Sequence, residues 1–162
     1  MTIIITSFFL DIMISKWVNF NSFFYPLFSI LSLIFSFLYF NKKDNSFFIS
    51  AFILGLLYDV VITDTLFLNA FVFSILSLIL KQIFRKIKFN YLAILLISLG
   101  TIVYYRLMVY LILIILNYLE FNIFKIINSI LSSVFLNLIY ITIIYVVINY
   151  KKIIFKKRKH IY

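Results

Sequence analysis

Residues 55–70 read GLLYDVVITDTLFLNA and place two carboxylates, Asp59 and Asp64, between apolar stretches that continue on both sides. A buried carboxylate is costly unless it is paired or hydrogen-bonded. The stretch therefore predicts that one helix ends, a short turn follows and a second helix begins, with Asp59 inside the first helix. Asp64 falls in the turn, where it is either a solvated carboxylate or the N-cap of the second helix.

The composition indicates an integral membrane protein. Of the 162 residues, 65% are hydrophobic and only 12% are charged, and the mean hydropathy is +1.17. A soluble domain of this size has too little interior to bury so many apolar side chains. The N-terminus has no basic region followed by a small-residue cleavage pattern, so we expect no cleavage of a signal peptide.

The sequence lacks the residue types that catalysis or cofactor binding would need. The chain has no cysteine, its one histidine is His160 in a basic tail, and its two glycines, Gly55 and Gly100, are too far apart for a phosphate-binding loop. We therefore expect no catalytic residues, no metal site and no cofactor, and we predict that the protein is not an enzyme.

The apolar stretches have the length of transmembrane helices. A helix needs about 20 mostly apolar residues to cross the hydrocarbon, and blocks such as LSLIFSFLYF lack the alternation of barrel strands. The sequence predicts an all-α, polytopic integral membrane protein, a six-helix bundle that forms a single transmembrane domain over residues 1–162. The predicted helices cover 3–18, 26–40, 46–62, 65–80, 91–116 and 126–148, and a basic tail covers 149–162.

The basic residues predict the orientation of this bundle. Of the 15 Lys and Arg residues, all except Lys16, Arg106 and Lys125 fall after the second helix, after the fourth helix or in the tail. An excess of Lys and Arg marks the cytoplasmic side, so both termini are predicted to be cytoplasmic. The tail is also suited to contact anionic lipid headgroups, although topology alone accounts for its charge. Nucleic-acid binding is not expected.

Four ionisable residues lie inside the predicted helices, namely Asp11, Lys16, Asp59 and Arg106. They do not form an obvious relay for protons or ions. Counted from the cytoplasmic ends of their helices, Asp59 is about 18 Å and Arg106 about 22 Å along. Because charges at membrane depth usually pair, an ion pair between Asp59 and Arg106 is one interpretation. The other is that Arg106 extends to the membrane surface while Asp59 caps or lines the outer helix end.

Small residues mark a further candidate surface on the third helix. Ala51, Gly55 and Asp59 share one face at spacings of four residues, and small residues allow helices to approach closely in lipid. Together with Leu56 and Leu57 they form a candidate interface, either for a partner or for helix packing.

Two polar stripes on other helices are typical of packing within the chain, with an interface to a partner helix as the alternative. The stripes consist of Ser29, Ser32 and Ser36 on the second helix, and of Ser129, Ser133 and Asn137 on the sixth.

The segment AFILGLLYDVVITDTLFLNAFVFSILSLIL resembles the central signature of the rod shape-determining protein MreD family, a G-L-L-x-D run that ends one helix before a short turn. The residues that match this run are Gly55, Leu56, Leu57 and Asp59. The proline-started segment YPLFSILSLIFSFLYF and the basic C-terminal tail also resemble the family. The sequence departs from the family in TDTLFLN, where Phe67 replaces the second glycine of a G-S-P-L-G-like run.

The resemblance implies a multi-pass protein of the bacterial cytoplasmic (inner) membrane that acts as a non-catalytic scaffold in cell-wall elongation. It implies association with MreC and, through MreC, with MreB filaments, the RodA glycosyltransferase and a class B penicillin-binding transpeptidase. Membrane lipids and a second copy of the chain, as a homo-oligomer, are further partners to consider.

The alternative function is the substrate-binding S subunit of an energy-coupling-factor transporter, which is also a six-helix protein of this size. Such a subunit is expected to carry an Ala-rich, small-xxx-small surface on its first helix. The corresponding segment, TIIITSFFLDIMISKWVNF, contains neither Ala nor Gly. A membrane protein with a purely structural role is the third interpretation.

Overall fold

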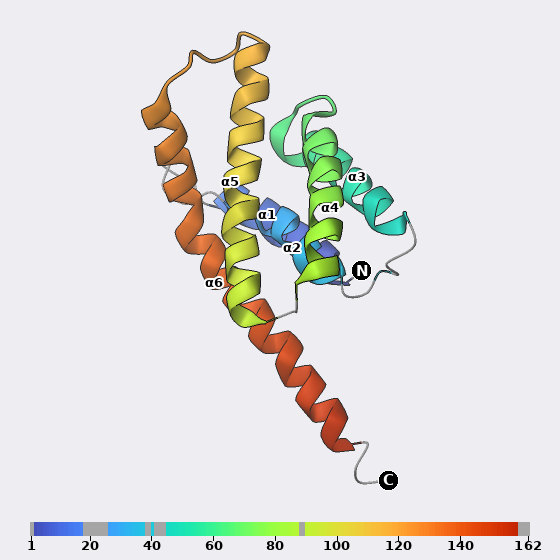
Figure 1. Cartoon of the computed structure of the whole chain (residues 1–162). Coiled ribbons are helices and arrows are strands. Elements are labelled where there is room, and N and C mark those ends of the chain that lie inside the picture. The colour runs from blue at the N-terminus through green and yellow to red at the C-terminus, as the bar shows by residue number, and fades with distance from the viewer. Residues whose placement is uncertain (1, 18–25, 38–39, 41–44, 88–89, 159–162) are drawn as a thin grey trace.

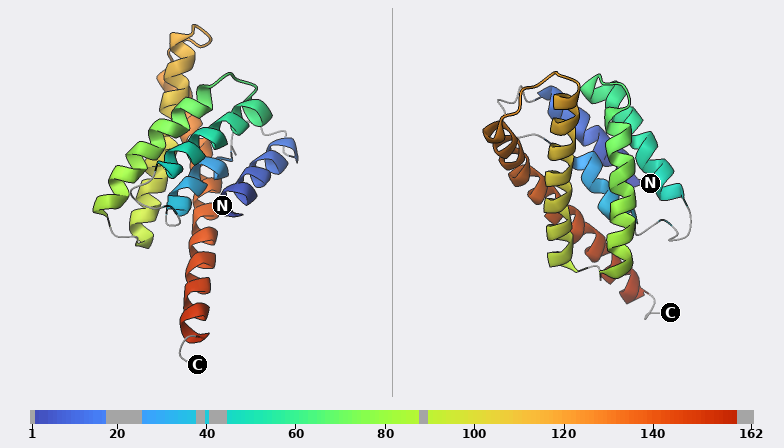
Figure 2. Two further views of the ribbon diagram at one scale, coloured as in Figure 1. Left: turned by 90° about the vertical axis from the view of Figure 1, so that its right-hand side faces the viewer. Right: turned by 45° about the horizontal axis from the view of Figure 1, so that its top comes forward.

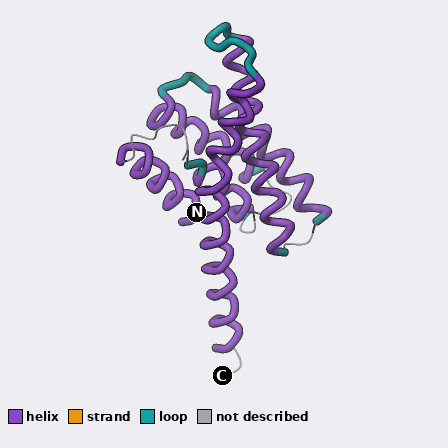
Figure 3. Tube along the Cα trace, turned by 90° about the vertical axis from the view of Figure 1, so that its left-hand side faces the viewer, coloured by secondary structure: helices purple, strands orange, loops and turns teal. Residues whose placement is uncertain are grey.

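The computed structural model describes residues 2–17, 26–37, 40, 45–87 and 90–158. Within these residues the structure consists of six α-helices and one π-helical turn, without any strand (Figure 3). The prediction of an all-α membrane protein is thus confirmed. Several residues that entered the sequence argument lie outside the described residues: Lys42, Lys43, Lys88, Lys159 and His160.

Figure 1 shows the helices in chain order, from α1 in blue to α6 in orange and red. Because a bilayer offers no water to backbone N–H and C=O groups, long apolar segments satisfy these groups internally as helices. In chain order the elements are α1 (Thr2–Trp17), α2 (Phe28–Ser36), α3 (Ser46–Tyr58), the π-helical turn η2 (Asp59–Thr63), α4 (Leu68–Lys86), α5 (Tyr91–Ile115) and α6 (Ile123–Arg158).

Four helical segments in the described part of the chain are long and apolar enough to cross a membrane: Ser46–Thr63, Leu68–Lys86, Tyr91–Ile115 and Ile123–Tyr150. Helix α1 is apolar but shorter. Helix α2 has 9 residues, so it is only about 14 Å long, against about 30 Å of hydrocarbon. The helix predicted over 26–40 is therefore a short internal helix within the described residues.

Consecutive helices pack as three hairpins, and α2 lies at their centre. Helix α1 packs on α2, α3 on α4 and α5 on α6, while α2 also contacts α4, α5 and α6. The two further views show α2 enclosed by its neighbours (Figure 2). Every residue of α2 is buried. The core thus forms around a helix that has no lipid-facing side.

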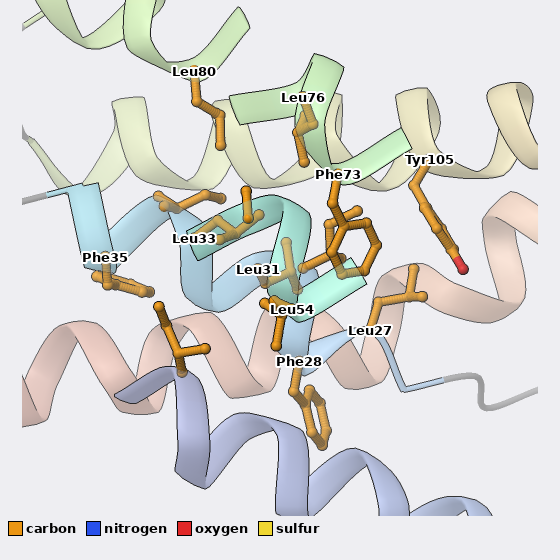
Figure 4. Close-up of a cluster of buried hydrophobic side chains, with 14 of the residues drawn as sticks. Leu27, Phe28, Leu31, Leu33, Phe35, Leu54, Phe73, Leu76, Leu80 and Tyr105 are labelled. Atoms are coloured by element: carbon orange, nitrogen blue, oxygen red, sulfur yellow. The ribbon is translucent and has the colours of Figure 1, made fainter. Parts of the chain in front are cut away.

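The core consists of aliphatic and aromatic side chains that meet around α2. Leu31 and Leu33 of α2 lie near Leu54 of α3, with Leu76 of α4 on the other side of α3, and Phe35 lies farther along α2 (Figure 4). Lipid tails are as apolar as these side chains, so close packing and hydrogen bonds hold the bundle together, rather than the exclusion of water. Polar contacts at the helix ends therefore carry much of the specificity.

The N-terminus of α2 receives polar groups from two other helices. The Asp11 carboxylate of α1 accepts hydrogen bonds from the amides of Phe28 at 2.9 Å and Ser29 at 2.7 Å. The side-chain oxygen of Asn137 on α6 accepts one from the Leu27 amide at 2.9 Å. These bonds satisfy amides that a helix start leaves without an internal partner. Pro26 precedes the helix instead of opening its first turn as predicted.

Two helix boundaries differ from the predicted ones for local reasons. Helix α4 begins at Leu68 rather than at 65, because Phe67 adopts a left-handed backbone with φ of 59°. Helix α6 continues to Arg158 instead of ending at 148. Its last segment, YKKIIFKKR, contains neither Gly nor Pro to stop it. Most of the predicted tail therefore continues the helix.

Replacing Asp11 by Asn is expected to destabilise the protein. An amide cannot accept from two N–H groups with the strength of a carboxylate, and bonds to a charged group contribute about 1.5–3 kcal/mol. We expect the thermal midpoint of the purified protein in detergent to fall by roughly 4–10 °C. Ser15→Ala on the same helix is the control, since Ser15 is exposed and its hydroxyl bonds the Ile12 carbonyl of its own helix. Equal midpoints for the two variants would contradict the role of Asp11.

Candidate functional site

Helices α3 and α4 approach each other closely at Gly55. A Cβ atom placed on Gly55 would lie 2.5 Å from the Ala70 Cα and 2.6 Å from the Asn69 carbonyl oxygen. Real Cβ atoms do not approach backbone so closely, and backbone cannot move aside as a flexible side chain can. Gly55 is therefore required by the crossing of the two helices. Ala51, one turn earlier, is also fully buried.

One turn after Gly55, the Asp59 carboxylate binds the N-terminus of α4. Its Oδ1 accepts hydrogen bonds from the Asn69 amide at 2.9 Å, the Asn69 side-chain amide at 2.9 Å and the Thr65 hydroxyl at 2.6 Å. Its Oδ2 accepts from the Ala70 amide at 3.0 Å. The positive end of the helix dipole also favours a carboxylate at this place. Asp59 is 1% exposed, and its charge is compensated by these donors.

The backbone between Asp59 and α4 is shaped to bring the carboxylate to the helix start. Residues Asp59–Thr63 form a π-helical turn, and Asp64 follows with a left-handed φ of 51°. Two hydroxyls close the turn, because Thr63 and Thr65 share a hydrogen bond at 2.8 Å. The Asn69 side-chain amide also donates to Thr63 at 2.9 Å. The turn and the helix start therefore form one hydrogen-bonded unit.

Helix α5 joins this unit through Tyr105. The Tyr105 hydroxyl donates to the Asn69 side-chain oxygen at 2.8 Å. Asn69 thus bonds Asp59 and Thr63 through its nitrogen and Tyr105 through its oxygen. We call Asp59, Thr63, Thr65, Asn69 and Tyr105 the Asp59 cluster.

The next residue on α5, Arg106, bonds a different helix. The Arg106 Nε donates to the Ser133 hydroxyl of α6 at 2.7 Å. One turn further along α6, Asn137 donates to the Ser133 carbonyl at 2.6 Å and accepts from the Leu27 amide. Tyr140 of α6 then shares a hydrogen bond with Ser7 of α1. Polar contacts therefore connect α5, α6, α1 and the start of α2.

The structure places the residues of the candidate interface on two sides of α3. Ala51, Gly55 and Asp59 are buried, and α4 covers Gly55 and Asp59. Leu56 is half-buried, and Leu57 is 46% exposed on the outer face. The small-residue face therefore lies in packing within the chain, and a partner would meet the outer face.

Asp59 lies at the end of α3 and Arg106 lies on α5, and the two residues have different partners in the contacts described above. Asp59 bonds the start of α4, whereas the Nε of Arg106 bonds α6. The predicted ion pair between the two residues stays a prediction. Asp64 is exposed, and the carboxylate that binds the start of α4 belongs to Asp59. Of the two roles predicted for Asp64, the role of N-cap is therefore wrong.

Sequence reasoning did not identify Asp11, Asn69 or Tyr105 as site residues. Asp11 was noticed as a charge within the first helix, but nothing local indicated that it binds the start of α2, 17 and 18 residues later. Asn69 offered a signal in the sequence, because Asn is favoured at turns and helix starts, where its side chain hydrogen-bonds nearby groups. Nothing in the sequence distinguishes Tyr105 from the other aromatic residues of α5.

The geometry of the Asp59 cluster favours positioning over chemistry. Each carboxylate oxygen is bound by donors of the chain itself, and Asp59 and Asn69 are both 1% exposed. A group held in this way fixes the relative position of three helices. The fold and this cluster together define a helical membrane protein whose buried polar residues join its helices.

The comparison with known families identifies the kind of membrane protein. The family model of rod shape-determining protein MreD matches residues 1–153, so the chain belongs to the MreD family. The resemblance in the sequence is thereby confirmed, and the protein is a rod shape-determining membrane protein. No curated protein and no solved structure matches the chain.

Adding a single methyl group at Gly55 is expected to destabilise the protein, because it would collide with the backbone of α4. Overpacking of this kind typically costs about 1–3 kcal/mol. For Gly55→Ala we expect the thermal midpoint in detergent to fall by roughly 2–10 °C. Gly100→Ala is the matched control, because a Cβ at Gly100 meets no atom within 4 Å. A fall for Gly100→Ala as large as that for Gly55→Ala would refute the assignment.

Removing the charge of Asp59 is expected to loosen the junction between α3 and α4. In Asp59→Asn the new NH2 group would face an N–H group that in the unchanged protein donates to a carboxylate oxygen. We expect the free energy of unfolding to fall by about 2–4 kcal/mol. Asp64→Asn is the control, because Asp64 is exposed and surface changes are usually within about 0.5 kcal/mol. Hydrogen exchange of the Asn69 and Ala70 amides would measure the effect. Unchanged protection in Asp59→Asn would count against the role of Asp59.

Proposed function

We propose that this chain is a non-catalytic scaffold of the bacterial cell-elongation machinery in the cytoplasmic membrane. In this role it binds MreC and, through MreC, connects MreB filaments to the RodA glycosyltransferase and a class B penicillin-binding transpeptidase. Membership of the MreD family is the main support. The proposal also includes cytoplasmic termini.

The observation that carries the proposal is the use of the family signature in the structure. Gly55 and Asp59 hold α3 against α4, and Tyr105 connects α4 to α5. The signature thus makes a rigid junction inside the bundle rather than an open reactive site. A rigid bundle with apolar outer faces suits a protein that binds the transmembrane helices of others.

The charges at the helix ends agree with the proposed orientation. Arg85 and Lys86 are exposed at the C-terminal end of α4, and Asp64 is exposed beyond its N-terminal end. Since basic residues mark the cytoplasmic side, α4 would end in the cytoplasm and the turn at Asp64 would face outward.

Affinity purification from native bacterial membranes would test the proposed function. A tagged copy is extracted in mild detergent, and the proteins bound to it are identified by mass spectrometry. We expect MreC together with cell-wall synthases, and a tagged polytopic membrane protein of unrelated function serves as the control. Recovery of paired ATPases with a membrane coupling subunit would instead support the transporter alternative. Recovery of neither set would remove the scaffold proposal.

A further inference from the structure

The two long hairpins of the bundle differ in length. Helix α4 has 19 residues, or about 28 Å. Its partner segment Ser46–Thr63 has 18 residues, or about 27 Å. Helix α5 has 25 residues, or about 38 Å. The α5–α6 hairpin is therefore longer than the hydrocarbon thickness of about 30 Å, whereas the α3–α4 hairpin just matches it.

The extra length lies at the end where α4 begins. Helix α4 ends at Lys86 and α5 begins at Tyr91, so these two ends are close to each other. The bond from Tyr105 to Asn69 sets the start of α4 near the middle of α5. Residues 106–115 then continue about 15 Å further. Figure 1 shows the α5–α6 connection well beyond the turn between α3 and α4.

This difference in length leaves an apolar groove between the two hairpins. The groove has a volume of about 860 Å³ and lies between residues 64–71 of the α3–α4 hairpin and residues 112–119 of the α5–α6 hairpin. Leu66 is 91% exposed, Phe67 is 63% exposed and Tyr118 is 75% exposed. We call this surface the outer groove.

The position of the outer groove means that lipid covers it only in part. When the basic end of α4 lies at one membrane surface, about 30 Å of hydrocarbon ends near the start of α4. The apolar residues above this level, such as Ile112 of α5 and Leu116 directly after it, then lie among headgroups and water. An apolar surface at this height indicates a protein interface.

The backbone at Phe67 gives a second observation on the same surface. Its φ of 59° is a conformation that glycine adopts freely and that costs energy for a residue with a Cβ. The aromatic ring nevertheless lines the outer groove and is mostly exposed. Strained residues of this kind are found where a side chain is needed for binding.

The charges around the outer groove constrain its occupant. Asp64 lines the groove and is exposed, and Glu120 is exposed just beyond it. A second copy of the chain, docked through a two-fold axis, would bring the same acidic residues toward each other. A lipid chain ends within the hydrocarbon and cannot cover the part of the groove above it. A helix that carries a basic residue near its outer end meets both requirements.

We propose that the outer groove is the docking site for a transmembrane helix of a partner membrane protein. The helix is apolar, continues past the outer edge of the hydrocarbon, and carries a Lys or Arg that faces Asp64. The proposal rests on the proposed function only in that the partner is another membrane protein.

Photo-cross-linking in living cells would test this docking site. A photoreactive phenylalanine analogue replaces Phe67 or Tyr118 and, as the control, Leu96, which is 69% exposed on α5 but does not line the groove. We expect adducts at both groove positions and none at Leu96 with the same partner. The cross-linked peptide should map to the outer end of a transmembrane helix with a nearby Lys or Arg. Adducts with lipid alone, or with a second copy alone, would overturn the proposal.

Variants separate docking from folding. Phe67→Gly relieves the backbone strain, so we expect an unchanged or higher thermal midpoint, together with about tenfold weaker association through loss of an aromatic contact. Asp64→Asn should reduce cross-linking at Tyr118 without destabilising the chain, whereas Leu96→Ala should change neither property. Cross-linking at Tyr118 that is as strong in Phe67→Gly as in the unchanged chain would overturn the proposal.

Failure of this proposal can be distinguished from failure of the proposed function. Elongation proteins that still co-purify with Phe67→Gly, with no adduct at the groove, would reject the groove but keep the scaffold function. A mapped helix adduct on a protein outside the elongation machinery would reject the function but keep the groove.

Discussion

A carboxylate from one helix that binds the first amides of the next is the interaction on which this fold depends. Asp11 binds the start of α2, and Asp59 binds the start of α4. The residues that carry these amides are buried in the bundle and cannot bond to water, so a helix that begins there needs such a partner. The same arrangement is thus used twice, in the first hairpin and in the second.

Helix α5 connects the two carboxylate sites. Tyr105 reaches the Asp59 cluster, while the adjacent Arg106 reaches Ser133 on α6, in the polar chain that leads to the start of α2. Adjacent residues on a helix point to different sides, so one turn of α5 serves both halves of the bundle. A change at either site therefore alters a hydrogen-bonded contact that involves α5.

The sequence predicted the parts of the structure that follow from local pattern. Apolar stretches gave the long helices, and the run from Gly55 to Asp59 marked the junction of α3 and α4. What escaped prediction depends on contacts between distant residues. The short length of α2 and the role of Asp11 require knowledge of which helices meet, because Asn137 and Asp11 both act on amides elsewhere in the chain. The ion pair predicted for Asp59 stays a prediction, and the backbone amides at the start of α4 already compensate the charge of this carboxylate.

The burial of α2 has a consequence for the order in which the helices assemble. Translation and membrane insertion proceed from the N-terminus, yet the amide of Leu27 binds Asn137, which follows 110 residues later. A helix too short to cross the bilayer and buried on every side cannot reach its final place until α5 and α6 have entered the membrane. The N-terminal hairpin therefore lacks some of its hydrogen bonds until the last helix has been synthesised. Any factor that shields this hairpin during insertion would act before the final helix arrives.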